Sequence, residues 1–301
     1  MRKILFIILM IPFLCNCSDQ EYSEEGIKES STPLAISSAS LSPAINEGMT
    51  LRSSEYINTT TFTDQSKIGV YLMKSTGYAT QINNVEYDYS TSTAKWTPAA
   101  TNTQNISLNN NPATVCAYYP LGAAGIVSTT DPTNVQLTTQ LYTSAEDLSY
   151  ANYALDPTNQ TNPKKPTNNS PDVLFKMQHA YACLSLNIKN TSNQNLTFSQ
   201  VKISNPNIKS SGILNISNGI YKNDDSPSGE VIIPINISIK KHSSNSIDIL
   251  LVPVTTTMSN NVCFTFYVNR LPNNRTANLD ATLFESSQIL AGHHYNIYFN
   301  I

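Results

Sequence analysis

Charged residues are scarce in this chain of 301 residues. Asp, Glu, Lys and Arg together make up 13% of the sequence and leave a net charge of −3, so the chain lacks the basic surface that nucleic-acid-binding proteins use. Glycine is scarce as well, with ten residues in all, and no Gly-rich phosphate-binding loop occurs. These shortages exclude nucleic acid as a partner and argue against a P-loop enzyme.

Sequence motifs of common hydrolases and metal sites are also missing. No G-x-S-x-G, H-E-x-x-H or C-x-x-C pattern occurs. His293 and His294 are neighbours on an expected strand and point to opposite faces, so they do not readily share a metal. His179 is expected to be structural, and the adjacent Glu146 and Asp147 favour a solvated loop over a glycosidase pair. We therefore expect a protein that is not an enzyme, with no catalytic residue, metal or cofactor; a hydrolase with a scattered active site stays open.

The cysteines do not predict a disulfide framework. If Cys15 leaves with a signal peptide and Cys17 carries a lipid, an odd number remains. These are Cys116, Cys183 and Cys263, and each lies within an apolar run, which favours buried and unreactive thiols.

The longest apolar run lies at the start of the chain. It covers residues 4–14 and follows the basic Arg2 and Lys3, which is the pattern of a secretory signal. A transmembrane helix needs about 20 apolar residues. We therefore expect a signal peptide over residues 1–16 and no transmembrane helix.

Where the signal peptide meets the tether, "LCNC" (residues 14–17) resembles the lipobox of a bacterial lipoprotein and places Cys17 at the lipid-bearing position. The other interpretation is that Cys17 only marks the edge of an ordinary signal peptide. Residues 17–32 are polar and acidic and predict a flexible tether. The Ser-Asp pair after Cys17 resembles a surface-export signal of Bacteroidetes lipoproteins. We expect a surface-exposed protein attached to the outer membrane through the lipid.

Apolar residues recur with a period of two along the rest of the chain, and helical periodicity is nearly absent. Short runs rich in β-branched and aromatic residues alternate with turn residues, which predicts an all-β fold of antiparallel sandwiches. The expected strands are residues 67–73, 113–119, 184–189, 196–204, 229–239, 246–254, 261–269 and 293–301.

A proline-rich, polar stretch over residues 156–172 predicts a linker or a long exposed loop. About 270 residues after the tether exceed what one ordinary core needs, so two domains are expected. We place the boundary near residue 171, which gives an amino-terminal domain over 33–170 and a carboxy-terminal domain over 171–301.

Three aromatic residues are candidates for contact with a ligand. They are Trp96 in "TAKWTPAA" and Tyr87 and Tyr89 in "VEYDYS", which lie in segments rich in aromatic residues, and rings of this kind stack on sugars. Packing across neighbouring strands explains the same residues without any ligand.

Several segments resemble, in order, the landmarks of the fimbrillin family of Bacteroidales, the subunits of type V pili. They are "FTDQSKIGVYLM", "TAKWTP", "ATVCAYYPLG", "VLFKMQHAYACLSLNIKN", "SSGILNISNGIY", "ILLVPVT" and "ILAGHHYNIYFNI". The resemblance implies two transthyretin-like antiparallel β-sandwich domains, a place in a cell-surface fimbria and other pilin subunits as partners.

The resemblance also gives Arg52 a role, and Arg52 is the single arginine between Arg2 and Arg270. Such pilins assemble after an arginine-specific protease removes an N-terminal segment, which here would be residues 33–52, so that the mature chain begins at Ser53. A strand from a neighbouring subunit would then fill the vacated groove by β-augmentation. The alternative is that Arg52 is an exposed loop residue that is never cut.

Within the segment expected to be removed, apolar and polar residues alternate weakly in "PLAISSASLSPAI" (residues 33–45), and Ile36, Ala39 and Leu41 are the expected anchors. Stalk subunits of the family continue past the last strand with a donor segment, whereas this chain stops at Ile301. That difference favours a tip or capping adhesin, with a glycan or protein ligand on a host or bacterial surface. A surface lipoprotein that binds glycans and does not polymerise is the alternative.

Overall fold

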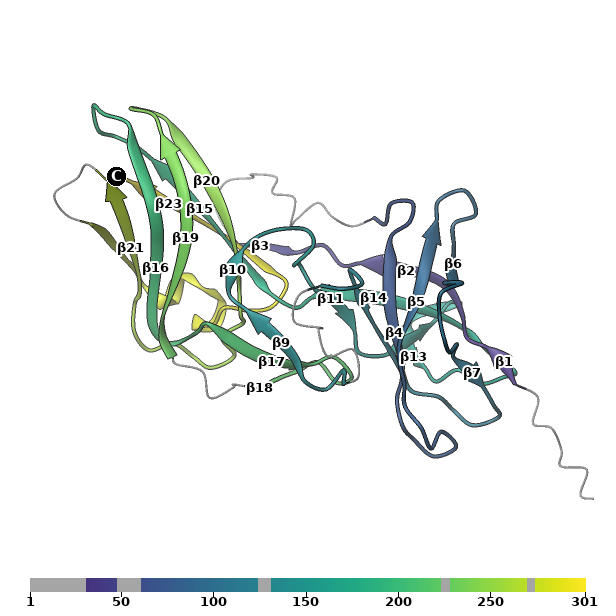
Figure 1. The fold of residues 1–301 in the computed structure, drawn as a ribbon. Coiled ribbons are helices and arrows are strands. Elements are labelled where there is room, and N and C mark those ends of the chain that lie inside the picture. The colour runs from purple at the N-terminus through teal and green to yellow at the C-terminus, as the bar shows by residue number, and fades with distance from the viewer. Residues whose placement is uncertain (1–30, 48–60, 124–130, 223–227, 270–273) are drawn as a thin grey trace, which may run out of the picture.

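The computed structural model describes residues 31–47, 61–123, 131–222, 228–269 and 274–301. Its regular structure is almost entirely strands, with two short 3₁₀ helices, η1 (Ala281–Leu283) and η2 (Glu285–Ser287). None of the helices in these residues is long and apolar enough to cross a membrane. The prediction of an all-β fold is confirmed. The molecule is elongated, and strand β1 (Thr32–Pro33) and the carboxy-terminal residue lie at opposite ends (Figure 1).

All eight segments that the apolar pattern predicted form strands. Buried and more exposed side chains alternate along β21 (Val262–Asn269), because successive side chains of a strand point to opposite faces. The other seven are β4 (Lys67–Leu72), β8 (Val115–Tyr119), β15 (Ala182–Lys189), β16 (Leu196–Lys209), β19 (Ser228–Ile239), β20 (Ser244–Leu251) and β23 (His293–Asn300). Three of these, β4, β8 and β15, are buried along nearly their whole length.

The carboxy-terminal half is a two-layer sandwich. One layer has the strand order β10-β20-β15-β23-β3, where β10 is Gln140–Leu141 and β3 is Ile45–Glu47; the other has the order β19-β16-β21-β22, where β22 is Arg275–Leu279. Apolar side chains from both layers fill the space between them and include Leu186, Phe198 and Phe264. We call this cluster the carboxy-terminal core, and its buried members lie between Ala182 and Phe299.

The amino-terminal half is a sheet that closes on itself. Its order is β11-β8-β4-β5-β6-β2-β14-β12-β13, and an additional pairing of β11 with β14 completes a ring. The strands not yet given are β2 (Ala35–Leu41), β5 (Ile82–Ser90), β6 (Lys95–Pro98), β11 (Ser149–Ala151), β12 (Ala154–Asp156), β13 (Asn159–Lys164) and β14 (Asp172–His179). The ring encloses a second cluster, the amino-terminal core, with Ile68, Val70 and Phe175 among its fully buried members.

The two halves are interleaved. Strand β9 (Val135–Thr138) pairs with β17 (Ser211–Asn215), which also pairs with β18 (Ile220–Lys222), and β10 pairs with β20. A third cluster, the junction core, contains Tyr71 and Tyr118 from the amino-terminal half and Leu214 and Leu250 from the other. A boundary near residue 171 between separately folding domains stays a prediction, and these pairings argue against it.

The stretch over residues 156–172 differs from the linker or open loop that its composition predicted. Strands β12 and β13 form an antiparallel hairpin there, at the edge of the nine-stranded sheet. The side chains of β13 are mostly exposed, so its sequence carries no apolar alternation, and backbone hydrogen bonds alone define the strand. The next strand, β14, also belongs to this sheet, so the chain changes from one sheet to the other between β14 and β15.

The expectation of free, buried thiols is confirmed for two of the three cysteines. Cys116 and Cys183 are free and buried, and Cys263 is free and half-buried. Burial raises the pKa of the Cys116 thiol to about 12, which keeps it protonated and unreactive at neutral pH.

Candidate functional site

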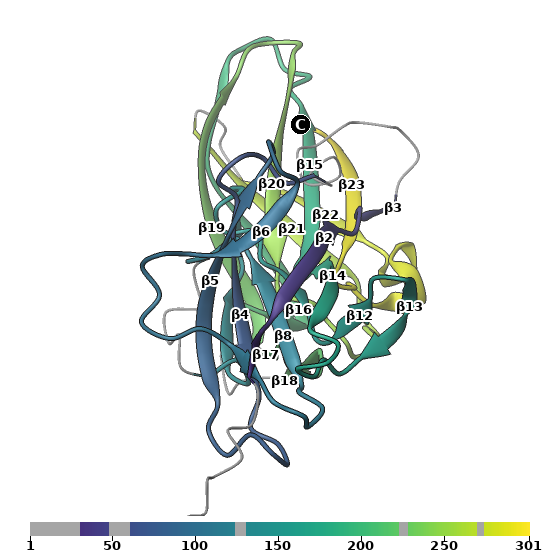
Figure 2. The ribbon, with the colours of Figure 1, turned by 90° about the vertical axis from the view of Figure 1, so that its right-hand side faces the viewer.

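Strand β2 closes the ring of the amino-terminal half. It pairs in parallel with β14, from Ala35 opposite Asp172 to Leu41 opposite Met177, with one register shift between Val173 and Leu174. On its other side it pairs with β6, where Ile36 lies opposite Trp96. Figure 2 shows β2 between these two neighbours. Without β2 the ring would present two unpaired edges, β6 and β14.

The side chains of this segment form part of the amino-terminal core. Leu34, Ile36 and Leu41 are only 2%, 4% and 5% exposed, and Ala39 packs against the same cluster while half-buried. Ile36, Ala39 and Leu41 are the anchors that the sequence pattern predicted. Leu34 is a fourth, equally buried anchor that the pattern did not single out, although it stands two residues before Ile36 in the same alternation.

Backbone hydrogen bonds fix both ends of the segment. The Leu34 N–H donates to the Ile106 carbonyl oxygen at 3.0 Å, and the buried Tyr87 hydroxyl donates to the Leu34 carbonyl oxygen at 3.3 Å. At the far end, the Ser42 N–H donates to the Met177 carbonyl oxygen at 2.7 Å. Pro43 follows and cannot donate to a ladder, which is why β2 ends there.

The same segment continues into the carboxy-terminal half. After Ala44, which is buried in the junction core, β3 pairs in parallel with the start of β23. The Ile45 N–H donates to the Gly292 carbonyl oxygen at 2.7 Å, while the Ile45 side chain is 56% exposed. Residues 32–47 therefore contact both halves, firmly through β2 and weakly through β3.

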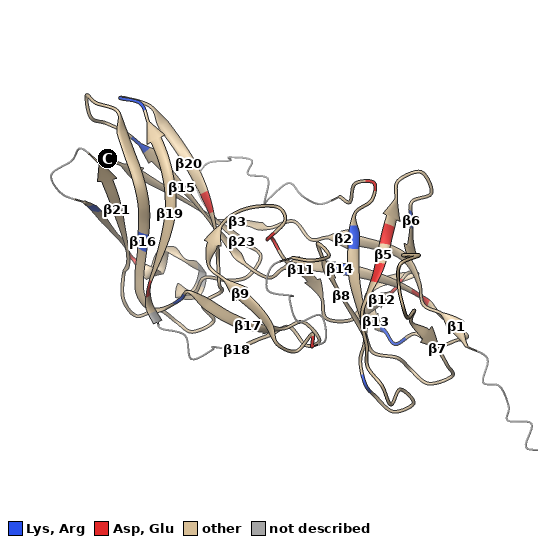
Figure 3. Cartoon of the chain, viewed as in Figure 1, with Lys and Arg blue, Asp and Glu red and all other residues tan. Residues whose placement is uncertain are grey.

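Charge plays little part in holding the segment. Residues 33–46 contain no ionisable side chain, and charged groups are sparse and scattered over the described residues (Figure 3). Lys67 of β4 pairs with Glu86 and, at 3.5 Å, with Asp88 of β5, and neither of these strands pairs with β2. Apolar burial and backbone hydrogen bonds thus hold the segment against the rest of the protein. Dissolved salt weakens interactions between exposed charges and has little effect on either of these.

The three aromatic candidates lie in or beside the amino-terminal core. Tyr87 is 1% exposed and Trp96 is 5% exposed, whereas Tyr89 is half-buried. The rings of Tyr89 and Trp96 are 5.0 Å apart between centroids, and Phe62 packs edge-on against Trp96 at 4.9 Å. Packing between strands accounts for these contacts, and ligand contact at these residues stays a prediction.

The three residues predicted to be modified or cut lie outside the described residues. They are Cys17, Arg52 and Ser53. The described parts of the chain nevertheless place Arg52 after β3 and before β4 in the sequence. A cut at Arg52 would therefore separate β1, β2 and β3 from every other strand, leaving them bound without a covalent connection.

His179 at the end of β14 has the structural environment that the sequence predicted. Its Nδ1 lies 3.1 Å from Oδ1 of Asp147, and both side chains are buried. The expectation of a solvated loop is wrong for Asp147, because the segment before β11 folds against β14 and encloses the carboxylate. The pair thus ties the segment before β11 to the end of β14.

Comparisons with known proteins agree with the fold. The model of a family described as fimbrillin-like matches residues 54–301. A candidate cell adhesion protein of Bacteroides uniformis has a TM-score of 0.54 and 18% identity, over 80% of this chain and 88% of its own. A second, from Bacteroides ovatus, has a TM-score of 0.53 and 16% identity, over 90% and 92%. A third, from Bacteroides fragilis, has a TM-score of 0.54 and 14% identity, over 89% and 93%. No curated protein matches the chain.

Proposed function

The chain belongs to the fimbrillin-like family and is a fimbrial subunit, and on that premise we propose that it assembles by exchanging its N-terminal strands for a strand of a neighbouring subunit. One observation carries the proposal. Strand β2 completes a closed sheet and an apolar core, yet it precedes Arg52, while the other strands of that ring follow Arg52. The family match likewise begins at residue 54 and leaves β1, β2 and β3 outside it.

Removal of the segment would create an acceptor groove. The edges of β6 and β14 would carry unpaired N–H and C=O groups, and the sites of Leu34, Ile36 and Leu41 would open to water. Exposed edges and apolar pockets are both unfavourable, and an extended apolar segment satisfies both at once. The incoming strand would run parallel to β14 and place apolar residues where Ile36 and Leu41 now lie.

The maturation steps follow from the same proposal. The precursor is a lipoprotein held in the outer membrane by the lipid on Cys17, and cleavage after Arg52 releases the body of the protein, which begins at Ser53. The weak apolar character of the segment suits a strand that must be displaced. A Cys17→Ala variant should lose lipid labelling and remain unprocessed, whereas loss of labelling in Cys15→Ala alone would show that the lipid site is misplaced.

We place this subunit at the tip or cap of the fimbria. Strand β23 pairs with β15 along nearly its whole length, from His294 opposite Cys183 to Asn300 opposite Lys189. The Ile301 N–H also donates to the Lys189 carbonyl oxygen at 2.8 Å. This strand is thus occupied within its own sheet and is not poised to leave as a donor. A ligand on a host or bacterial surface is the expected target of such an adhesin.

Replacement of Arg52 tests the proposed processing and assembly. Arg52→Ala and Arg52→Lys should both block an arginine-specific cut, and the lysine variant separates loss of the cleavage site from loss of charge. Both variants should fold and retain residues 33–51, yet fail to join fibres, as measured by N-terminal sequencing and by electron microscopy of surface fractions. Arg275→Ala, on exposed β22, is the matched control and should assemble normally.

Normal assembly of either Arg52 variant would overturn strand exchange. So would surface protein that still begins at Cys17 within fibres. Glycan binding by the uncleaved monomer, with no oligomers after proteolysis, would instead favour a surface lipoprotein that binds glycans without polymerising.

A further inference from the structure

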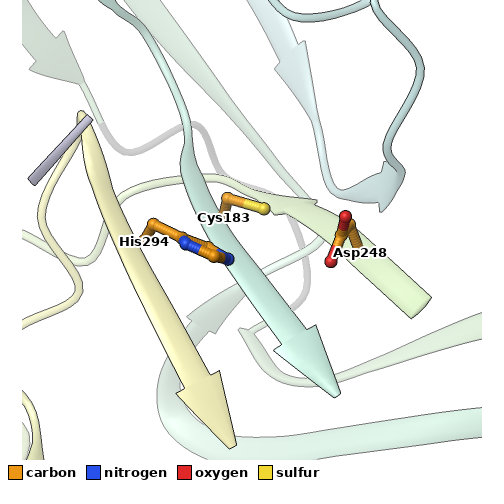
Figure 4. A group of neighbouring side chains, drawn as sticks. All are labelled: Cys183, Asp248 and His294. Carbon is orange, nitrogen blue, oxygen red and sulfur yellow. The ribbon is translucent and has the colours of Figure 1, made fainter. Parts of the chain in front are cut away.

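Three potential metal ligands meet on the outer face of the five-stranded sheet. They are Cys183 of β15, Asp248 of β20 and His294 of β23, which occupy adjacent strands (Figure 4). Because side chains alternate along a strand, Leu184 points into the carboxy-terminal core while Cys183 points away from it. Cys183 lies directly opposite His294 in the parallel pair, which brings the thiol and the imidazole together.

The ligand atoms of these three residues are close together. The Cys183 sulfur, a carboxylate oxygen of Asp248 and a ring nitrogen of His294 all lie within 4.8 Å of one another. In a tetrahedral zinc site, bonds of about 2.0–2.3 Å place neighbouring ligand atoms roughly 3.3–3.7 Å apart. Metal binding would therefore require side-chain rotations that draw the three ligand atoms closer together. Cys183 and His294 are fully buried and Asp248 is half-buried, so the site is partly enclosed and reachable from one side.

A hydroxyl group lies between two of the ligands. The Ser185 Oγ is 2.6 Å from Nε2 of His294, and it also donates to the Asp248 carboxylate. Since the serine proton goes to the carboxylate, the imidazole N–H donates to Ser185. This direction is the reverse of a serine protease triad, in which the serine donates to the imidazole, so the arrangement is not that of an activated nucleophile.

We propose that Cys183, Asp248 and His294 bind a divalent metal ion of the zinc class. A thiolate, an imidazole and a carboxylate together match the ligands that Zn²⁺ uses in proteins. The metal would replace the hydrogen bonds made through Ser185, whose hydroxyl or a water molecule would complete the four-coordinate shell.

This site could not be recognised from the sequence. Its ligands come from three strands separated by long stretches of chain, so none of the short spacings typical of zinc motifs occurs. The sequence predicted no metal ligand and indicated that the neighbouring His293 and His294 do not readily share a metal. The opposite-face argument is confirmed, because His293 stacks with Tyr295 on the other face of β23 while His294 faces the thiol.

Titration of the purified protein with Co²⁺ tests the proposal. One equivalent should bind and produce the intense thiolate-to-cobalt charge-transfer absorption of a cysteine-ligated ion, together with the visible bands of a tetrahedral site. Cys183→Ser should abolish the charge-transfer absorption. His294→Gln and Asp248→Asn should each weaken Co²⁺ binding by about tenfold or more, because each removes a direct ligand.

Matched variants separate the metal site from a purely structural hydrogen-bond network. Cys116→Ser, Cys263→Ser and His293→Gln each keep the three ligands and should retain the Co²⁺ spectrum. Ser185→Ala removes the bridging hydroxyl and should also retain the Co²⁺ spectrum. If the three residues instead formed only a hydrogen-bond network between the strands, Co²⁺ would produce no such spectrum in the wild type or in Ser185→Ala. If Cys183→Ser does not fold, the spectra of wild type and His294→Gln still decide.

A second readout uses stability. Zn²⁺ should raise the melting temperature of the wild type in a concentration-dependent way, because it binds the folded state, and at the same Zn²⁺ concentration it should raise that of His294→Gln less. Absence of a charge-transfer band in the wild type would overturn the proposal. Persistence of the full spectrum in Cys183→Ser, or an unchanged affinity in His294→Gln, would overturn it equally.

Discussion

The amino-terminal and carboxy-terminal cores differ in how the chain supplies them. The buried members of the carboxy-terminal core lie between Ala182 and Phe299, whereas the amino-terminal core takes Leu34, Ile36 and Leu41 from before Arg52 and its other members from after it. The carboxy-terminal half loses only the short β3 edge when the N-terminal segment leaves, while the other half loses a strand from inside its sheet. The carboxy-terminal half therefore keeps its core without the N-terminal segment, whereas the amino-terminal half needs another strand in place of β2.

The junction core limits how independent the two halves can be. Tyr71, Tyr118 and Tyr181 are all buried there, among residues of both halves. Loss of β2 from the amino-terminal core should therefore leave the carboxy-terminal half folded only if the junction core stays packed. The predictions below test that asymmetry, beginning with the largest expected effect.

Cleavage after Arg52 followed by removal of residues 33–52 should strongly destabilise the amino-terminal half. The three buried anchors contribute about 1.5–3 kcal/mol each, a sum comparable to the whole stability of a typical domain. Thermal unfolding followed by circular dichroism should show a new transition at lower temperature, with the main transition of the carboxy-terminal sandwich close to its original position. If the cleaved protein instead unfolded in one transition at a lower temperature, the two cores would depend equally on the N-terminal segment.

Replacement of one anchor should destabilise the precursor but not the assembled subunit. Ile36→Ala leaves a cavity in the amino-terminal core and should lower the free energy of unfolding by about 2–5 kcal/mol. The matched variant Ile203→Ala, in the carboxy-terminal core, should cost a similar amount. Urea unfolding before cleavage, and after assembly, measures both. Only Ile203→Ala should still be destabilising after assembly, because Ile36 has then been removed.

A smaller effect is expected at Tyr87. Tyr87→Phe deletes the hydrogen bond to the Leu34 carbonyl oxygen and should lower the free energy of unfolding of the precursor by about 0.5–1.5 kcal/mol. The ring remains, so the core packing is preserved. Urea denaturation of the variant and the wild type measures this loss. An equal loss in protein that no longer contains residues 33–52 would show that the bond to Leu34 is not its source.

Salt should have almost no effect on release of the segment. Residues 33–46 carry no charge, so no ion pair needs to be screened for β2 to leave. The rate at which the cleaved segment dissociates, followed by size exclusion or mass spectrometry, should change little between low and high NaCl concentrations. A steep salt dependence would mean that charges outside β2 control release.

Much of this architecture could be predicted from the sequence because apolar alternation survives wherever one face of a strand is buried. β21 shows that alternation in full, whereas β13 is exposed along most of its length and could not be recognised from its Pro, Asn and Lys content. Ile36 and Leu41 could be predicted as anchors from their spacing. The interleaving of β9 with β17 could not, since pairing between distant strands leaves no local pattern. The proposed metal site at Cys183 could not be predicted for the same reason, because its three residues come from strands that are far apart in the sequence.

Hydrogen exchange of β14 amides tests the central claim most directly. In the precursor these amides should be protected, because β2 pairs with β14 from Asp172 to Met177. After cleavage at Arg52 and removal of the segment, protection should fall at β14 and β6 and persist at β15 and β21. A peptide of residues 32–47 should restore it, whereas the same peptide with Ile36→Asp and Leu41→Asp should not. Full protection of β14 in the stripped monomer, with no peptide or neighbouring subunit bound, would contradict the account.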